Sequence, residues 1–169
     1  MTLNGMTLKG IILNAMIRDG WLLLIAMLWA SPVTAQTFPV DDSASQVLEA
    51  GPIKMRWDAL VPQPGQASTM TGQVVVLVRL DVAQWRGRRA RIYQTLPSLP
   101  IGPVDVRWTA NGPLLPGTLR NGGRTLVYAG PIQSDRLEDT FRMTIQADGN
   151  RVLRPQDLTF AFDIELESP

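Results

Sequence analysis

Phe141-Arg142-Met143-Thr144-Ile145-Gln146-Ala147 has an apolar residue at every second position, and Leu158-Thr159-Phe160-Ala161-Phe162-Asp163-Ile164-Glu165-Leu166 continues the same pattern over nine residues. Side chains of a β-strand switch faces at each residue, so strict alternation predicts a strand with one buried face. Helical spacing of apolar residues, by three and four over three turns, is found nowhere in the chain. The two segments therefore predict an all-β protein.

Five further segments are predicted strands. Residues 53–59 alternate, with Ile53, Met55, Trp57 and Ala59 on one side, whereas 74–82 is a β-branched run typical of a strand buried on both faces. The remaining three are residues 91–96, 104–108 and 125–129. Turn-forming sequences such as Asn121-Gly122-Gly123 separate the strands, and one helical turn is possible at 135–140. About seven short strands with such turns predict a small antiparallel β-sandwich.

Residues 1–35 are predicted to be a signal peptide. The run of ten apolar residues at 21–30 is half the length of about 20 residues that a membrane-spanning helix needs. Ser31 and Pro32 follow it, and then Val33-Thr34-Ala35 places small residues where a signal peptidase cleaves. We expect an exported protein that begins at Gln36 and has no transmembrane segment; the alternative is an uncleaved membrane anchor.

After cleavage the chain divides into a polar N-terminal arm at 36–51 and a β-sandwich domain at 52–169. Removing Lys9, Arg18 and Asp19 from 16 basic and 15 acidic residues leaves 14 of each. A neutral domain lacks the broad positive field of a dedicated nucleic-acid-binding protein, so no nucleic-acid partner is expected.

The chain contains neither cysteine nor histidine. Disulfides, thiol nucleophiles, Cys/His zinc sites and Ser-His-Asp triads are excluded, and Lys54 is the only lysine of residues 36–169 that a Ser-Lys pair could use. The adjacent acids Asp41/Asp42 and Glu138/Asp139 give no acid–base site, because neighbours on a strand point to opposite faces. We therefore expect no enzyme activity, no metal and no cofactor.

One cluster of charge stands out, Trp85-Arg86-Gly87-Arg88-Arg89-Ala90-Arg91, in a predicted loop between two strands. Guanidinium groups bind anions through paired hydrogen bonds, so Arg86, Arg88, Arg89 and Arg91 are candidates for contact with an envelope polysaccharide, a lipid headgroup or a phosphate. The alternative is a solvated hairpin tip whose charges prevent edge-to-edge pairing.

Three acidic residues and two tryptophans give further expectations. Asp163, Glu165 and Glu167 share the outer face of the last predicted strand, where arginines across the sheet would be their partners. Trp57 and Trp108 lie on the apolar sides of their strands, which favours core packing, with a carbohydrate-stacking platform as the alternative.

The leader, the β domain at 36–169 and the alternating C-terminal strand at 158–166 resemble subunits of bacterial chaperone–usher fimbriae. The resemblance implies an incomplete immunoglobulin-like sandwich, folded with a periplasmic chaperone, delivered to an outer-membrane usher and completed by the arm of another subunit. The arm's apolar residues Phe38, Val40, Ala44 and Leu48 would be the donor residues, although Asp42 and Gln46 share their face. The expected function is that of a structural or adhesive fibre subunit at the cell surface; the alternative is a monomeric periplasmic binding or accessory protein.

Overall fold

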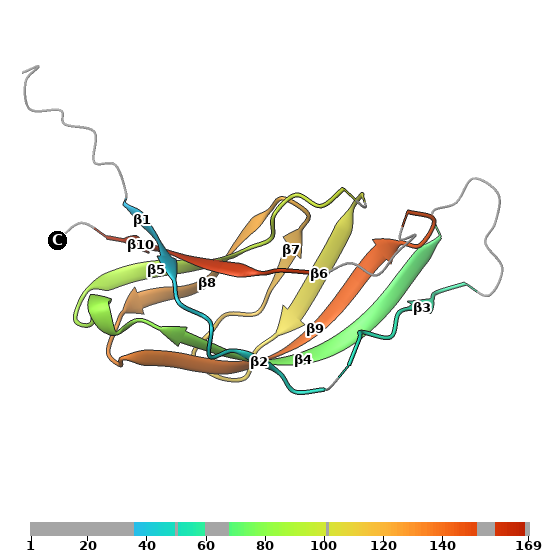
Figure 1. Ribbon diagram of the computed structural model, residues 1–169. Helices are drawn as coiled ribbons and strands as arrows, with labels where there is room; N and C mark the ends of the chain where they lie inside the picture. The colour runs from blue at the N-terminus through green and yellow to red at the C-terminus, as the bar shows by residue number, and fades with distance from the viewer. Residues whose placement is uncertain (1–35, 50, 60–67, 101, 152–157, 168–169) are drawn as a thin grey trace, which may run out of the picture. The chain divides into compact units, whose positions relative to one another are not determined.

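The computed structural model describes residues 36–49, 51–59, 68–100, 102–151 and 158–167, and the structural statements below concern these residues. The predicted signal peptide lies outside them. The described residues form ten strands and one short 3₁₀ helix, η2 (Ala83–Trp85), which confirms the all-β prediction. The strands make two antiparallel sheets that enclose the core (Figure 1).

The four-stranded sheet has the order β1-β10-β5-β8. Its strands are β1 (Thr37–Val40), β10 (Ala161–Leu166), β5 (Arg89–Thr95) and β8 (Arg124–Pro131). The six-stranded sheet has the order β2-β4-β9-β6-β7, with β3 also paired to β4. Its strands are β2 (Gln46–Val47), β3 (Arg56–Trp57), β4 (Thr69–Asp81), β9 (Arg136–Asp148), β6 (Val104–Thr109) and β7 (Gly117–Arg120).

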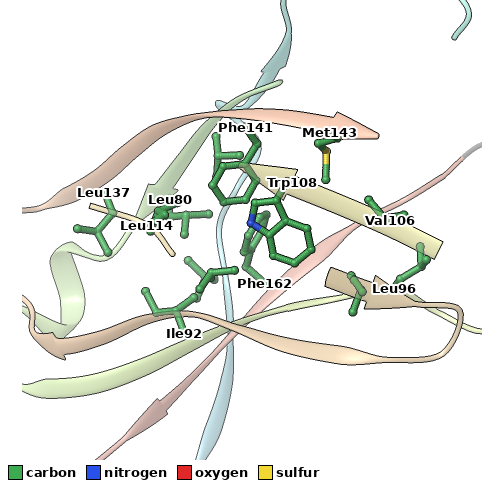
Figure 2. Close-up of a cluster of buried hydrophobic side chains, with 14 of the residues drawn as sticks. Leu80, Ile92, Leu96, Val106, Trp108, Leu114, Leu137, Phe141, Met143 and Phe162 are labelled. Carbon is green, nitrogen blue, oxygen red and sulfur yellow. The ribbon is translucent and has the colours of Figure 1, made fainter. Parts of the chain in front are cut away.

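Apolar side chains from both sheets meet in one core. Trp108 of β6 stacks on Phe141 of β9 with ring centroids 5.7 Å apart, and Ile92 of β5 lies across the core from them (Figure 2). Alternation accounts for this arrangement, because every second residue of β6 and β9 is buried. The two sheets therefore form the predicted β-sandwich.

Several predicted elements need correction. Residues 135–140 form no helical turn, since the alternation of β9 extends back to Leu137; the acidic Asp139 at an inward position concealed the pattern. Strand β4 is buried on one face rather than two, with Val74, Val78 and Leu80 inward and Gln73 exposed. Only two residues of the predicted strand 53–59 pair with β4. The short strands β1 and β2 lie in the segment predicted as a donor arm, and β7 was not predicted.

A buried polar residue lies within the core. Gln94 of β5 is 2% exposed, and its Oε1 atom has no hydrogen-bond partner among the described residues. An unsatisfied buried acceptor costs about 1–3 kcal/mol, so an apolar side chain of similar size is expected to be more favourable here. Gln94→Met should therefore raise the free energy of unfolding by about 1 kcal/mol in urea titrations. A lower stability of this variant would show that the amide of Gln94 is satisfied in solution.

Candidate functional site

The N-terminal segment, predicted as a polar arm, pairs with strands of the chain's own sandwich. Strand β1 pairs antiparallel with β10, with Phe38 opposite Ile164 and Val40 opposite Phe162 (Figure 1). Val40 is buried, and the ring of Phe38 lies 6.3 Å from that of Trp85 in η2. The two apolar residues thus close the core along the edge of the four-stranded sheet.

The rest of the predicted donor segment has a different environment. Ala44 is exposed, and Leu48 is 53% exposed beside β4. Between β1 and β2 the chain crosses to the six-stranded sheet, where the Ser45 hydroxyl accepts a 2.9 Å hydrogen bond from the Arg79 backbone N–H. Of the four predicted donor residues, Phe38 and Val40 therefore contact the core, whereas Ala44 and Leu48 do not.

Strand β1 is the edge of its sheet and carries a proline. Pro39 lies opposite Asp163 in the register with β10. A proline nitrogen donates no hydrogen bond, so this position must be one at which the backbone polar groups point away from the partner strand. Pro39 consequently removes one donor from the open edge, a feature that hinders the addition of another strand.

Two acidic residues distant in sequence form ion pairs with three of the four arginines in the cluster. Arg86 contacts Asp135 at 3.0 Å, and Glu167 accepts contacts from Arg89 at 3.0 Å and Arg91 at 3.3 Å. Within the described part of the chain, Arg88 makes no ion pair. Arg89 and Arg91 belong to β5, and β4 and β5 lie in different sheets, so this segment is neither a free loop nor the tip of a hairpin. Anion contact by the four arginines stays a prediction.

Of the three acidic residues predicted to have arginine partners, Glu165 and Glu167 have them, whereas Asp163 makes no ion pair with a described residue. Arg124 contacts Glu165 at 2.7 Å, and its guanidinium carbon lies 3.6 Å from the ring centroid of Tyr93. The hydrogen bond from Arg124 holds the pKa of Glu165 below its usual range. Ion pairs thus connect Arg124 of β8 with Glu165 of β10, and Arg89 and Arg91 of β5 with Glu167, which follows β10.

The paired carboxylates face apart, as alternation predicts. Glu138 points outward to Arg79 at 2.9 Å, whereas Asp139 points inward and is 6% exposed. Hydrogen bonding to Ser43 lowers the pKa of Asp41, and burial raises the pKa of Asp42.

Among the described residues, no group of three acidic side chains gathers into a metal site, and no helix is long and apolar enough to span a membrane.

Asp139 has a structural task that sequence reasoning missed. Its carboxylate accepts hydrogen bonds from the backbone N–H groups of Asn111 at 3.1 Å, Gly112 at 2.9 Å and Leu114 at 3.0 Å. On the opposite side of this loop, the Trp108 indole N–H donates to the Leu115 carbonyl at 3.0 Å. The β6–β7 loop is therefore held by two buried side chains.

The two tryptophans that the sequence treats alike differ in burial. Trp108 is 2% exposed, as core packing predicts, but Trp57 is 48% exposed, so its assignment to the core was wrong. Trp57 lies at the end of the sandwich, where its ring occupies the space that a Cβ atom on Gly149 would need. The two-residue length of β3 explains why Trp57 does not reach the core.

Comparisons with models of protein families, with curated proteins and with solved structures gave no match for this chain.

Proposed function

We propose that the chain is a non-enzymatic structural or adhesive subunit of an extracytoplasmic fibre, assembled by exchange of strand β1 between copies. The observation that carries the proposal is the place of β1: it is an edge strand, it precedes all other described strands, and β10 is its strand partner. A strand in this position can be removed without disturbing the order of the strands behind it.

Exchange is energetically plausible because the same contacts form within one chain or between two. The β1 of another copy would present Phe38 and Val40 to the same core and pair with β10 in the same register. When each chain gives its strand to the next and receives one from the previous chain, the result is an open filament rather than a closed dimer. A periplasmic chaperone and an outer-membrane usher would be the assembly partners, and the cell surface the final location.

The second candidate is a monomeric periplasmic binding or accessory protein. The observation that favours it is the pairing of β1 with the chain's own β10, which closes the sandwich without a second copy. The two candidates differ in one measurable property, which is whether β1 leaves its own sheet.

A reversible cross-link between β1 and β10 tests the exchange. The chain has no cysteines, so Pro39→Cys with Asp163→Cys introduces a single possible intramolecular disulfide. Opposed residues at such a position have Cα atoms about 4.5 Å apart, within the range of about 4.4–6.8 Å that disulfides span. We expect the oxidised variant to remain monomeric by size-exclusion chromatography with light scattering, and the reduced variant to form a ladder of oligomers.

The matched control is Pro39→Ser with Asp163→Ser, which changes the same positions without a cross-link and should assemble under both conditions. A wild-type protein that stays monomeric at high concentration would reject the fibre and favour the monomeric candidate. Oligomers of the oxidised variant that carry no intermolecular disulfide on non-reducing SDS gels would show that assembly uses another surface.

A further inference from the structure

Three arginines that are far apart in sequence form a diagonal row on the outer face of the six-stranded sheet. Arg107 of β6 is opposite Thr144 of β9, and Arg142 of β9 is opposite Thr109 of β6. Side chains two residues out of register on adjacent strands are about 7–8 Å apart at their Cα atoms, so Arg107 and Arg142 are diagonal neighbours. Arg120 of β7 continues the row on the other side of Arg107.

Two of the three guanidinium groups are available to a ligand. Arg120 contacts Asp105 at 3.2 Å, but neither Arg107 nor Arg142 has a carboxylate within ion-pair distance in the described part of the chain. Both side chains belong to exposed residues. This differs from the sequence cluster at 86–91, in which three of four arginines are ion-paired.

A shallow groove of about 430 Å³ runs across the same strands. Its lining consists of Asp105, Val106, Arg107, Thr118, Arg120, Thr144 and Gln146. Arg142 lies on the same face of the sheet but is not part of this lining. Threonine hydroxyls and the glutamine amide can donate and accept hydrogen bonds, whereas guanidinium groups bind carboxylates through two parallel hydrogen bonds. The groove thus combines side chains that can hydrogen-bond to ligand hydroxyls with guanidinium groups that can bind ligand carboxylates.

We propose that this face binds an acidic polysaccharide, with Arg107 and Arg142 contacting its acidic groups and Thr118, Thr144 and Gln146 its hydroxyls. The outward positions of β6, β7 and β9 contain no aromatic and no aliphatic residue. The face therefore lacks the stacking platforms that single-stranded nucleic acids require and the apolar side chains that enter lipid. A hydroxyl-rich polyanion fits both the charge and the hydrogen-bonding groups.

The experiment is a titration of the exported protein with polygalacturonate, a carboxylated polysaccharide, and with uncharged dextran as the matched polymer. Arg107→Gln/Arg142→Gln should weaken polygalacturonate binding at least about tenfold, because hydrogen bonds to charged groups contribute about 1.5–3 kcal/mol each. The control variant Arg86→Gln/Arg91→Gln removes the same number of positive charges from the ion-paired cluster. Its affinity for polygalacturonate should stay within about twofold of the wild type, because the lost charges affect only the long-range attraction of the polymer. Both variants change exposed residues, so their unfolding midpoints should equal that of the wild type.

Three results would overturn the proposal. They are equal binding of dextran and polygalacturonate, equal loss in both double variants, and no binding of polygalacturonate by the wild type. Tighter binding of oligo-deoxythymidine or of phosphatidylglycerol vesicles, lost in the Arg107→Gln/Arg142→Gln variant, would assign the face to nucleic acid or membrane instead. Polysaccharide binding at this face does not require strand exchange. The titration measures affinity, whereas the cross-linking experiment measures molecular mass, so one proposal can fail without the other.

Discussion

Asp139→Ala is expected to lower the free energy of unfolding by about 3 kcal/mol, since each buried donor left without a partner costs about 1–3 kcal/mol. The substitution removes the acceptor for three backbone N–H groups of the β6–β7 loop and for the N–H of Thr140 at 2.7 Å. Leu114 is 3% exposed, so water cannot replace the carboxylate at its N–H without opening the loop. Urea unfolding followed by tryptophan fluorescence measures the change.

The neighbouring acid provides the matched control. Glu138→Ala removes an outward carboxylate whose ion pair with Arg79 is partly exposed, so the loss should stay within about 1 kcal/mol. Asp139→Asn should lie between the two, because its amide keeps one acceptor oxygen but turns donor hydrogens toward the loop N–H groups. Equal losses for Asp139→Ala and Glu138→Ala would contradict the role of Asp139 in holding the loop.

Alternation in the sequence predicted β10 and the second half of β9, but it did not reveal the first half of β9 or the short strands β2 and β7. Apolar residues at every second position predicted much of β9 and β10, and the same rule placed Trp108 in the core. The two-residue strand β2 has too few positions to show a period, whereas the alternation over 53–59 predicted a longer strand than the two paired residues of β3. Their pairing depends on tertiary contacts, which local sequence does not record.

The candidate surfaces show a related limit. A cluster of arginines is conspicuous in the sequence at 86–91, but the fold brings Asp135 and Glu167 to it. Arg107 and Arg142 are 35 positions apart and become neighbours only through the pairing of β6 with β9. Sequence reveals which charges are adjacent along the chain, whereas the register of the sheet determines which charges remain available to a ligand.

Trp108→Ala is expected to cost about 3–5 kcal/mol, the usual range for deleting a large buried aromatic side chain. The indole is 2% exposed, stacks on Phe141 and donates to the Leu115 carbonyl. Its ring also passes so close to Gly117 that a Cβ atom there would lie 2.8 Å from it. The surrounding strands cannot collapse fully into the space that the ring leaves, so a cavity penalty adds to the lost transfer energy.

Trp57→Ala is the matched comparison, because it removes the same side chain from a site that is 48% exposed. About half of the apolar area is already in contact with water there, so the expected loss is about 1 kcal/mol. Thermal and urea unfolding of the two variants should therefore differ by at least about 2 kcal/mol in the free energy of unfolding. Similar losses would mean that Trp57 is buried in solution, and that the sequence expectation for this residue was correct after all. A small loss for Trp108→Ala would contradict the packing of β6 against β9 on which both the core and the arginine row depend.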